Sequence, residues 1–174
     1  GRNFEYFSED PVLSGLCAYY ETKGVQSFPG LGVTIKHFFC NNSEDNRCFI
    51  NEHVNERALR EIYLRNFQIA IENGNPYSIM TSYNLVNGIH TANHKPVIHN
   101  VVHNEWGYKG VIMTDWCTSM NICHAFARPN PRYGIALSKE CINAGNDLQM
   151  PGCQENEDDI VEGVEKGEVK IEDL

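Results

Sequence analysis

Short apolar segments that alternate with helical segments constrain the fold of this chain more than any other feature. Four strands are expected, at residues 32–35, 78–83, 111–115 and 147–150. Each is followed by a segment with helical features, and strands separated by helices at intervals of roughly 30 to 45 residues are typical of parallel β/α units. A complete eight-stranded β/α barrel needs about 250 residues. The 174 residues therefore predict an α/β fold with four or five β/α units, a partial (β/α)8 TIM-type barrel, in one domain over residues 1–174.

Five helices are expected, at residues 10–24, 54–72, 95–106, 134–143 and 155–166. The clearest is the second, because Leu59, Ile62 and Phe67 recur at helical spacing and Asn73-Gly74 follows as a C-cap. Three segments are expected to be loops, at residues 39–51, 84–91 and 125–133.

The charge balance excludes several kinds of partner. The chain has 14 basic and 23 acidic residues and a net charge of −9, which argues against nucleic acid or an anionic membrane surface. No apolar stretch reaches the length of a membrane helix, and the chain opens at Gly1 with no signal peptide. We therefore expect neither a nucleic acid nor a membrane partner.

The cysteines are informative about the compartment. Seven cysteines at irregular spacings favour reduced thiols and a cytoplasmic protein. Cys117, Cys123 and His124 are imaginable metal ligands, but no Cys-x-x-Cys pair supports such a site. We expect neither a metal nor a cofactor.

Polar residues stand at the C-terminal ends of three of the four expected strands. They are Lys36-His37, Ser82-Tyr83 and Asp115-Trp116, and the fourth strand ends at Met150-Pro151. Because the parallel strands of a barrel direct these ends toward one face, where ligands bind, the side chains are expected to meet there.

The pair Asp115-Trp116 carries the strongest functional signal. It follows the apolar run Val111-Ile112-Met113, which is typical of a buried parallel strand. An aromatic ring packs well on the C–H face of a pyranose, and a carboxylate can attack or stabilise an anomeric carbon. In the alternative interpretation, Asp115 caps the next helix and Trp116 belongs to the core.

Further donors surround this candidate carboxylate in the expected barrel. Lys36, His37 and Arg47 are strong hydrogen-bond donors for adjacent sugar hydroxyls, and nearby cations favour the ionised form of an attacking carboxylate. Tyr83 can donate a hydrogen bond to the nucleophile.

Each of these donors also has a structural interpretation. His37 can be a satisfied core imidazole, and Tyr83 can simply fill the barrel. Arg47 can pair with Asp45 or Glu44 on the surface.

An ordered series of motifs resembles the β/α-barrel domain of glycoside hydrolase family 3, of the β-glucosidase type. The matching segments cover nearly the whole chain: GRNFEYFSEDP (1–11), TIKHF (34–38), NNSEDNR (41–47), ERALRE (56–61), IMTSYN (79–84), GVIMTDW (110–116) and AGNDLQMPG (144–152). A Thr-Asp-Trp motif alone would be a weak signal, whereas seven motifs in the order of the family are a strong one.

The resemblance implies retaining, two-step hydrolysis of terminal non-reducing β-D-glucosyl residues of β-glucosides or oligosaccharides. Asp115 would be the nucleophile that forms the glycosyl-enzyme. The residues implied to bind the sugar are Arg2, Lys36, His37, Arg47, Tyr83 and Trp116. β-Xylosides are the alternative substrates. The loop 38–47 contains no histidine, unlike the branch of the family that cleaves N-acetylglucosaminides with a histidine acid/base there.

The resemblance also implies parts that this sequence does not contain. Early barrel strands with a sugar-binding aspartate would precede Gly1, and a second domain would carry the acid/base glutamate. We therefore expect natural substrates with poor leaving groups to react very slowly, since general acid catalysis contributes roughly 10²–10⁴ in rate. On such substrates the chain alone is expected to be inactive, or it is unstable. Unpaired sheet edges favour association with the rest of a parent enzyme or with a second copy.

Three other functions are compatible with the same residues. A non-catalytic carbohydrate-binding module would keep the sugar-binding side chains without covalent chemistry at Asp115. A barrel enzyme for phosphorylated substrates would need a glycine-rich phosphate loop, which Gly145 and Gly152 do not form. The candidate site residues can also be purely structural, in a chain that serves only as part of a scaffold.

Overall fold

A parallel three-stranded sheet forms the centre of the molecule. The computed structural model describes residues 1–119 and 132–174. The strands β1 (Thr34–Phe38), β3 (Ser78–Thr81) and β6 (Val111–Met113) pair in the order β1-β3-β6. Ile35 pairs with Ile79, and Ile79 pairs with Ile112. These three isoleucines are buried and belong to one core, so the α/β prediction and three of the four expected strands are confirmed.

The fourth expected strand, 147–150, is wrong as a strand. Only Leu148 pairs with the sheet, through an isolated parallel bridge to Met113. The segment lies beside β6, because the Ile112 N–H donates to the Asp147 carboxylate over 2.7 Å. A side chain thus takes the place of one ladder hydrogen bond there.

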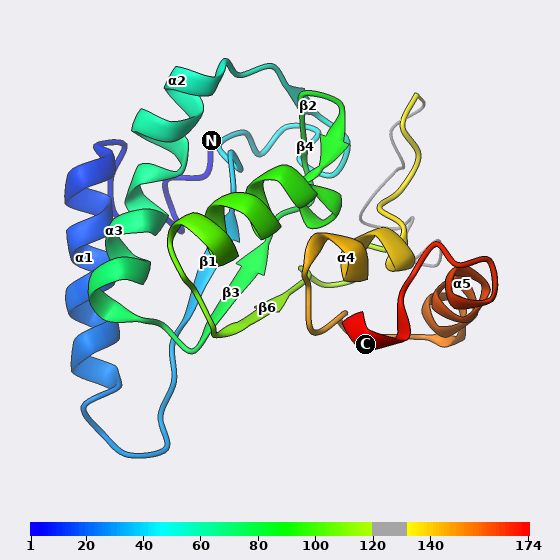
Figure 1. Cartoon of the computed structure of the whole chain (residues 1–174). Helices are drawn as coiled ribbons and strands as arrows, with labels where there is room; N and C mark the ends of the chain where they lie inside the picture. Colours follow the sequence, from blue (N-terminus) through cyan, green and yellow to red (C-terminus); the bar gives the residue numbers. More distant parts are fainter. Residues whose placement is uncertain (120–131) are drawn as a thin grey trace.

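Two helices from the N-terminal half of the chain lie beside β1 (Figure 1). Helix α1 (Pro11–Val25) begins where the Asp10 side chain accepts hydrogen bonds from the Val12 and Leu13 N–H groups, a standard N-cap. It packs along α3 (Arg65–Gly74), whose apolar residues Phe67, Ile69, Ala70 and Ile71 are buried.

The expected helix 54–72 is composite. It consists of α2 (Glu56–Ala58), the π-helical η1 (Leu59–Tyr63) and α3. Arg57 and Glu61 pair across one turn at 3.0 Å. Asn75 ends α3 in the left-handed conformation, one residue beyond the expected cap.

The helix before β6 is also π-helical. Residues Pro96–Glu105 form η3, close to the expected bounds of 95–106, and bury Val97, Ile98, Val101 and Val102. The short turn η2 (Thr91–Asn93) precedes it.

A second small sheet occupies segments where loops were expected. The strands β2 (Asn51–Glu52), β4 (Leu85–Val86) and β5 (Ile89–His90) pair in the order β2-β4-β5. The loop prediction for 84–91 is therefore wrong. Leu85 and Val86 are both fully buried, so apolar burial outweighs the turn residues Asn87 and Gly88.

The C-terminal part contains α4 (Ser138–Ala144), α5 (Gln154–Glu165) and the short η5 (Ile171–Asp173). The first begins four residues later than expected. The Leu137 N–H donates to the Asn93 side chain instead of entering a helix. Most of the expected loop 125–133, and the candidate ligands Cys123 and His124, lie outside the described residues.

The cysteines differ in state. Cys17, Cys40, Cys141 and Cys153 carry free thiols, whereas Cys117 is disulfide-bonded. The expectation that every thiol is reduced is therefore wrong at Cys117. None of the described helices is both long and apolar enough to cross a membrane.

Candidate active site

The carboxyl ends of the three parallel strands bring the expected polar residues together. Lys36 and His37 belong to the end of β1, Tyr83 follows β3 by two residues, and Asp115 follows β6 by two residues. The N-terminal segment before α1 adds Arg2 to the same cluster.

Asp115 lies at the centre of this cluster. Its side chain is 13% exposed, and its Oδ2 lies 3.4 Å from Nε2 of His37. Its Oδ1 accepts a hydrogen bond of 2.6 Å from the backbone N–H of Trp116. The carboxylate thus accepts a hydrogen bond from Trp116 and lies beside the His37 ring, yet it keeps a solvent-accessible part.

His37 is a buried imidazole with polar neighbours on both ring nitrogens. Its Nδ1 lies 3.3 Å from the Tyr6 hydroxyl and 3.7 Å from Glu5 Oε2. Burial lowers the pKa of His37 below its usual value, and the positive charge of Lys36 acts in the same direction, although Asp115 and Glu5 oppose both. The lowered pKa favours the neutral form of the ring at pH 7.

Tyr83 and Arg47 contact each other near Asp115. The Tyr83 hydroxyl donates a 2.6 Å hydrogen bond to the backbone carbonyl of Trp116. The Arg47 guanidinium lies over the Tyr83 ring, 5.4 Å from its centroid. Burial raises the pKa of Tyr83, and the negative charge of Asp115 raises it further. Tyr83 therefore remains a protonated donor near the carboxylate.

The alternative interpretation of Arg47 also has support, since its Nε lies 3.9 Å from Glu44 Oε1. Both partners are substantially exposed, so this pair contributes little stability. The alternative interpretation in which Trp116 belongs to the core is wrong, because 54% of Trp116 is exposed. A large exposed indole beside a carboxylate is suited to packing on a ligand.

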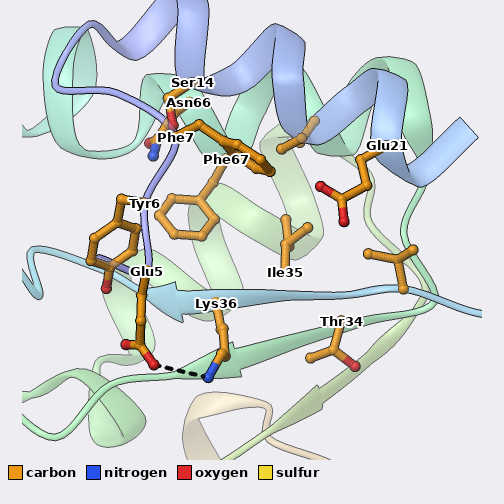
Figure 2. Close-up of a pocket in the computed structure, with 13 residues that line it drawn as sticks. Glu5, Tyr6, Phe7, Ser14, Glu21, Thr34, Ile35, Lys36, Asn66 and Phe67 are labelled. Carbon is orange, nitrogen blue, oxygen red and sulfur yellow. Dashed lines mark ion pairs between the residues drawn. The ribbon is translucent and has the colours of Figure 1, made fainter. Parts of the chain in front are cut away.

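Carboxylates hold the cations of the cluster in place. Arg2 is only 2% exposed and forms ion pairs with Glu5 and Glu44. Glu5 also pairs with Lys36 at 3.6 Å, as Figure 2 shows. Burial raises the pKa of Glu5, but the positive charges of Lys36 and Arg2 outweigh this effect, and the net pKa is lowered.

A cavity of about 160 Å³ lies next to this ion pair, between α1, β1 and α3 (Figure 2). Glu5, Tyr6, Lys36 and Phe67 are among its lining residues, and Asp115 is not. The cavity is therefore separate from the carboxylate at the end of β6.

The charges of the cluster balance. The permanent cations are Arg2, Lys36 and Arg47, and the carboxylates are Glu5, Glu44 and Asp115. Such a site presents many donors and acceptors but little net charge, which suits a neutral polyhydroxyl ligand. Among the described residues, no group of three or more His, Cys, Asp or Glu side chains is arranged to hold a metal ion.

Comparison with known proteins decides the family. The model of the glycosyl hydrolase family 3 N-terminal domain matches residues 1–174. The chain belongs to glycoside hydrolase family 3. The resemblance based on the seven motifs is thereby confirmed.

Family 3 relatives are similar in sequence and in structure. Beta-glucosidase B of Emericella nidulans is 45% identical over 152 residues, which are 87% of this chain and 16% of that protein. A beta-glucosidase of Rhizobium radiobacter is 40% identical over 99% of this chain and 19% of its own length. The structure of beta-glucosidase 3B from Thermotoga neapolitana in complex with glucose matches with a TM-score of 0.85 and 41% identity, over 99% of this chain and 23% of that one. The chain therefore spans about a fifth of the length of these relatives.

The seven candidate site residues were predictable from the sequence, but the side chains that support them were not. Glu5 joins three of the expected donors, and Tyr6 contacts His37. Both lie in the motif 1–11, next to Arg2. A carboxylate three residues after a candidate sugar-binding arginine was the available signal, but nothing in the sequence placed that segment against β1.

Proposed function

We propose that this chain provides the nucleophile and most of the sugar-binding side chains for retaining hydrolysis of terminal β-D-glucosyl residues. The observation that carries the proposal is the placement of Asp115 at a strand end between His37 and Tyr83. The names of the relatives, which are beta-glucosidases, support the same activity.

The proposed reaction has two displacement steps. In the first, Asp115 Oδ2 attacks the anomeric carbon, the bond to the aglycone oxygen breaks, and the aglycone leaves with the electron pair. In the second, water attacks the same carbon and loses one proton to the solvent. The bond from Asp115 to that carbon breaks, the carboxylate is regenerated, and the sugar is released with its original anomeric configuration. A general acid and base assists both steps in such enzymes, and we assign that role to no residue of this chain.

The hydroxyl groups of the sugar would be bound by the cations that Glu5 and Glu44 hold in place. Lys36 and Arg47 are partly exposed and can reach a ligand above the strand ends. Tyr83 would lie under the reacting ring, and Trp116 would pack on its C–H face. The balanced charge of the site favours a neutral glycoside over an anionic one. β-Xylosides remain the alternative substrates.

A non-catalytic sugar-binding role is the second candidate. The same donors and the exposed Trp116 would support binding without attack. The two functions differ at Asp115, because only the first needs a carboxylate that forms and breaks a bond.

Hydrolysis of 2,4-dinitrophenyl β-D-glucoside tests the proposal. Its leaving group departs without protonation, so no general acid is needed. We expect dinitrophenolate release by the purified chain and none by Asp115→Asn. The α-glucoside serves as the stereochemical control, and the β-xyloside tests the alternative substrate. Equal release by the chain and by Asp115→Asn would contradict the proposal, and binding without release would favour the second candidate.

A further inference from the structure

The N-terminal segment contains a hydrogen-bond relay that reaches the candidate nucleophile through His37. We propose that Tyr6 is a positioning residue that fixes His37 as the tautomer protonated at Nε2, with that N–H directed at Asp115. The tautomer follows from the geometry of the free site. Its consequence for catalysis rests on the proposed function.

The oxygen of Tyr6 has donor groups beside it. The groups that act on its pKa, besides burial, are the backbone of His37 and the side chains of Arg2 and Asn41. A backbone N–H and a guanidinium can only donate, so neither can take the proton of the Tyr6 hydroxyl. Within the described residues, Oδ1 of Asn41 is buried without a hydrogen-bond partner, so it does not take that proton either.

The proton of Tyr6 is directed at His37. A phenol oxygen has two acceptor positions and one proton to donate. The neighbouring donors can use only its acceptor positions, and Nδ1 of His37 is the hydrogen-bond partner of the hydroxyl at 3.3 Å, so the proton faces Nδ1. Burial raises the pKa of Tyr6, so this proton is retained across the neutral range.

The acceptor role of Nδ1 determines the tautomer of the His37 imidazole. A neutral histidine that accepts at Nδ1 must carry its proton at Nε2. That nitrogen lies 3.4 Å from Asp115 Oδ2, so an N–H faces the carboxylate instead of a lone pair. The opposite tautomer would place a lone pair against an ionised oxygen, which is unfavourable in a buried site.

The charged groups around the ring are consistent with this assignment. Asp115, Lys36, Glu5 and Arg2 all act on His37, two with each sign. Glu5 Oε2 lies 3.7 Å from Nδ1 and is already paired with Arg2, while Oε1 of the same carboxylate pairs with Lys36. Tyr6 therefore has the shorter contact with Nδ1, and Glu5 is the acceptor that would take over if the phenol proton were removed.

Long-range ¹H–¹⁵N NMR of the full chain, labelled at its histidine nitrogens and held at pH 7.5 without substrate, tests the proposal. The His37 signal is assigned by its loss in His37→Gln. We expect a protonated Nε2 and an unprotonated Nδ1 in the unsubstituted chain. In Tyr6→Phe we expect the Nδ1 resonance to shift toward the protonated position, because Nδ1–H can then donate to Glu5.

Tyr63→Phe is the matched control, since Tyr63 is similarly half-buried and should leave the His37 signals unchanged. A protonated Nδ1 in the unsubstituted chain, or an unshifted Nδ1 in a folded Tyr6→Phe, would overturn the proposal. If Tyr6→Phe does not fold, the tautomer of the unsubstituted chain still decides. Because no substrate is present, failure of the proposed glycoside hydrolysis would not affect this result.

Discussion

At the scale of single residues, the site separates side chains that bind from side chains that support. Arg2 and His37 are buried and have contacts on several sides, whereas Trp116 is mostly exposed. Substitutions of the two kinds should therefore have different effects, with stability changes at the buried residues and binding changes at the exposed one.

Trp116→Ala tests this distinction. We expect the KM for 2,4-dinitrophenyl β-D-glucoside to rise about 2- to 10-fold, because aromatic packing contributes about 0.5–1.5 kcal/mol. The free energy of unfolding should change by less than about 0.5 kcal/mol, as for other surface positions. Steady-state kinetics and urea unfolding measure the two effects. A large loss of stability with an unchanged KM would show that Trp116 supports the fold instead.

At the scale of elements, α1 has an unusual contact surface. Its buried positions against α3 are the small residues Ser14, Gly15 and Thr22. A Cβ at Gly15 would lie 2.8 Å from Cβ of Ile69 and 2.9 Å from the Asn66 carbonyl oxygen. The close approach of the two helices therefore depends on the absence of a side chain at residue 15.

Gly15→Ala and Gly24→Ala form a matched pair within the same helix. We expect Gly15→Ala to lower the free energy of unfolding by about 1–3 kcal/mol through overpacking. Gly24→Ala should raise it by roughly 0.4–1 kcal/mol, because the site is open and the unfolded chain loses freedom. Urea denaturation of the three proteins measures both changes. Equal effects at the two positions would contradict the close packing of α1 on α3.

Some of the strands, but not all of their pairings, were predictable from the sequence. The strands ending near Lys36, Tyr83 and Asp115 were predictable, because apolar runs and polar ends are local patterns. Residues 147–150 carry the same pattern, yet the Asp147 side chain takes a backbone donor of β6 and only one bridge forms. The pairing of β2 with β4 was not predictable, since it depends on contact between segments distant in sequence.

The candidate site was likewise predictable only where local patterns place its residues. Residues at strand ends were found because the topology of parallel strands places them on one face. Glu5 and Tyr6 were not found, because their role depends on how a segment without regular structure lies against β1. The π-helical geometry of η1 and η3 was also beyond local patterns, which predicted ordinary helices.

At the scale of the whole molecule, buried histidines link stability to pH. Burial lowers the pKa values of His37, His90 and His94. In the unfolded chain these histidines take up protons near pH 6.5, but in the folded chain they do so only at lower pH. The unfolded state therefore binds more protons as the pH falls below about 6.5, and stability decreases.

Urea unfolding at pH 7.5 and at pH 5.5 tests this linkage. We expect a lower midpoint at pH 5.5, and a smaller difference between the two pH values in the double variant His90→Gln/His94→Gln. His53 is exposed, so His53→Gln should keep the full difference. An equal or higher midpoint at pH 5.5 would exclude the three buried histidines as the main pH-dependent groups.

Covalent trapping tests the central claim most directly. The chain is incubated with 2,4-dinitrophenyl 2-deoxy-2-fluoro-β-D-glucoside, whose fluorine slows the second displacement so that the glycosyl-enzyme accumulates. Intact-protein mass spectrometry and peptide mapping then locate the adduct. We predict one fluoroglucosyl group, attached to Asp115 and missing in Asp115→Asn. A folded chain, verified by circular dichroism, that acquires no adduct or acquires it at another residue would contradict the assignment of Asp115 as the nucleophile.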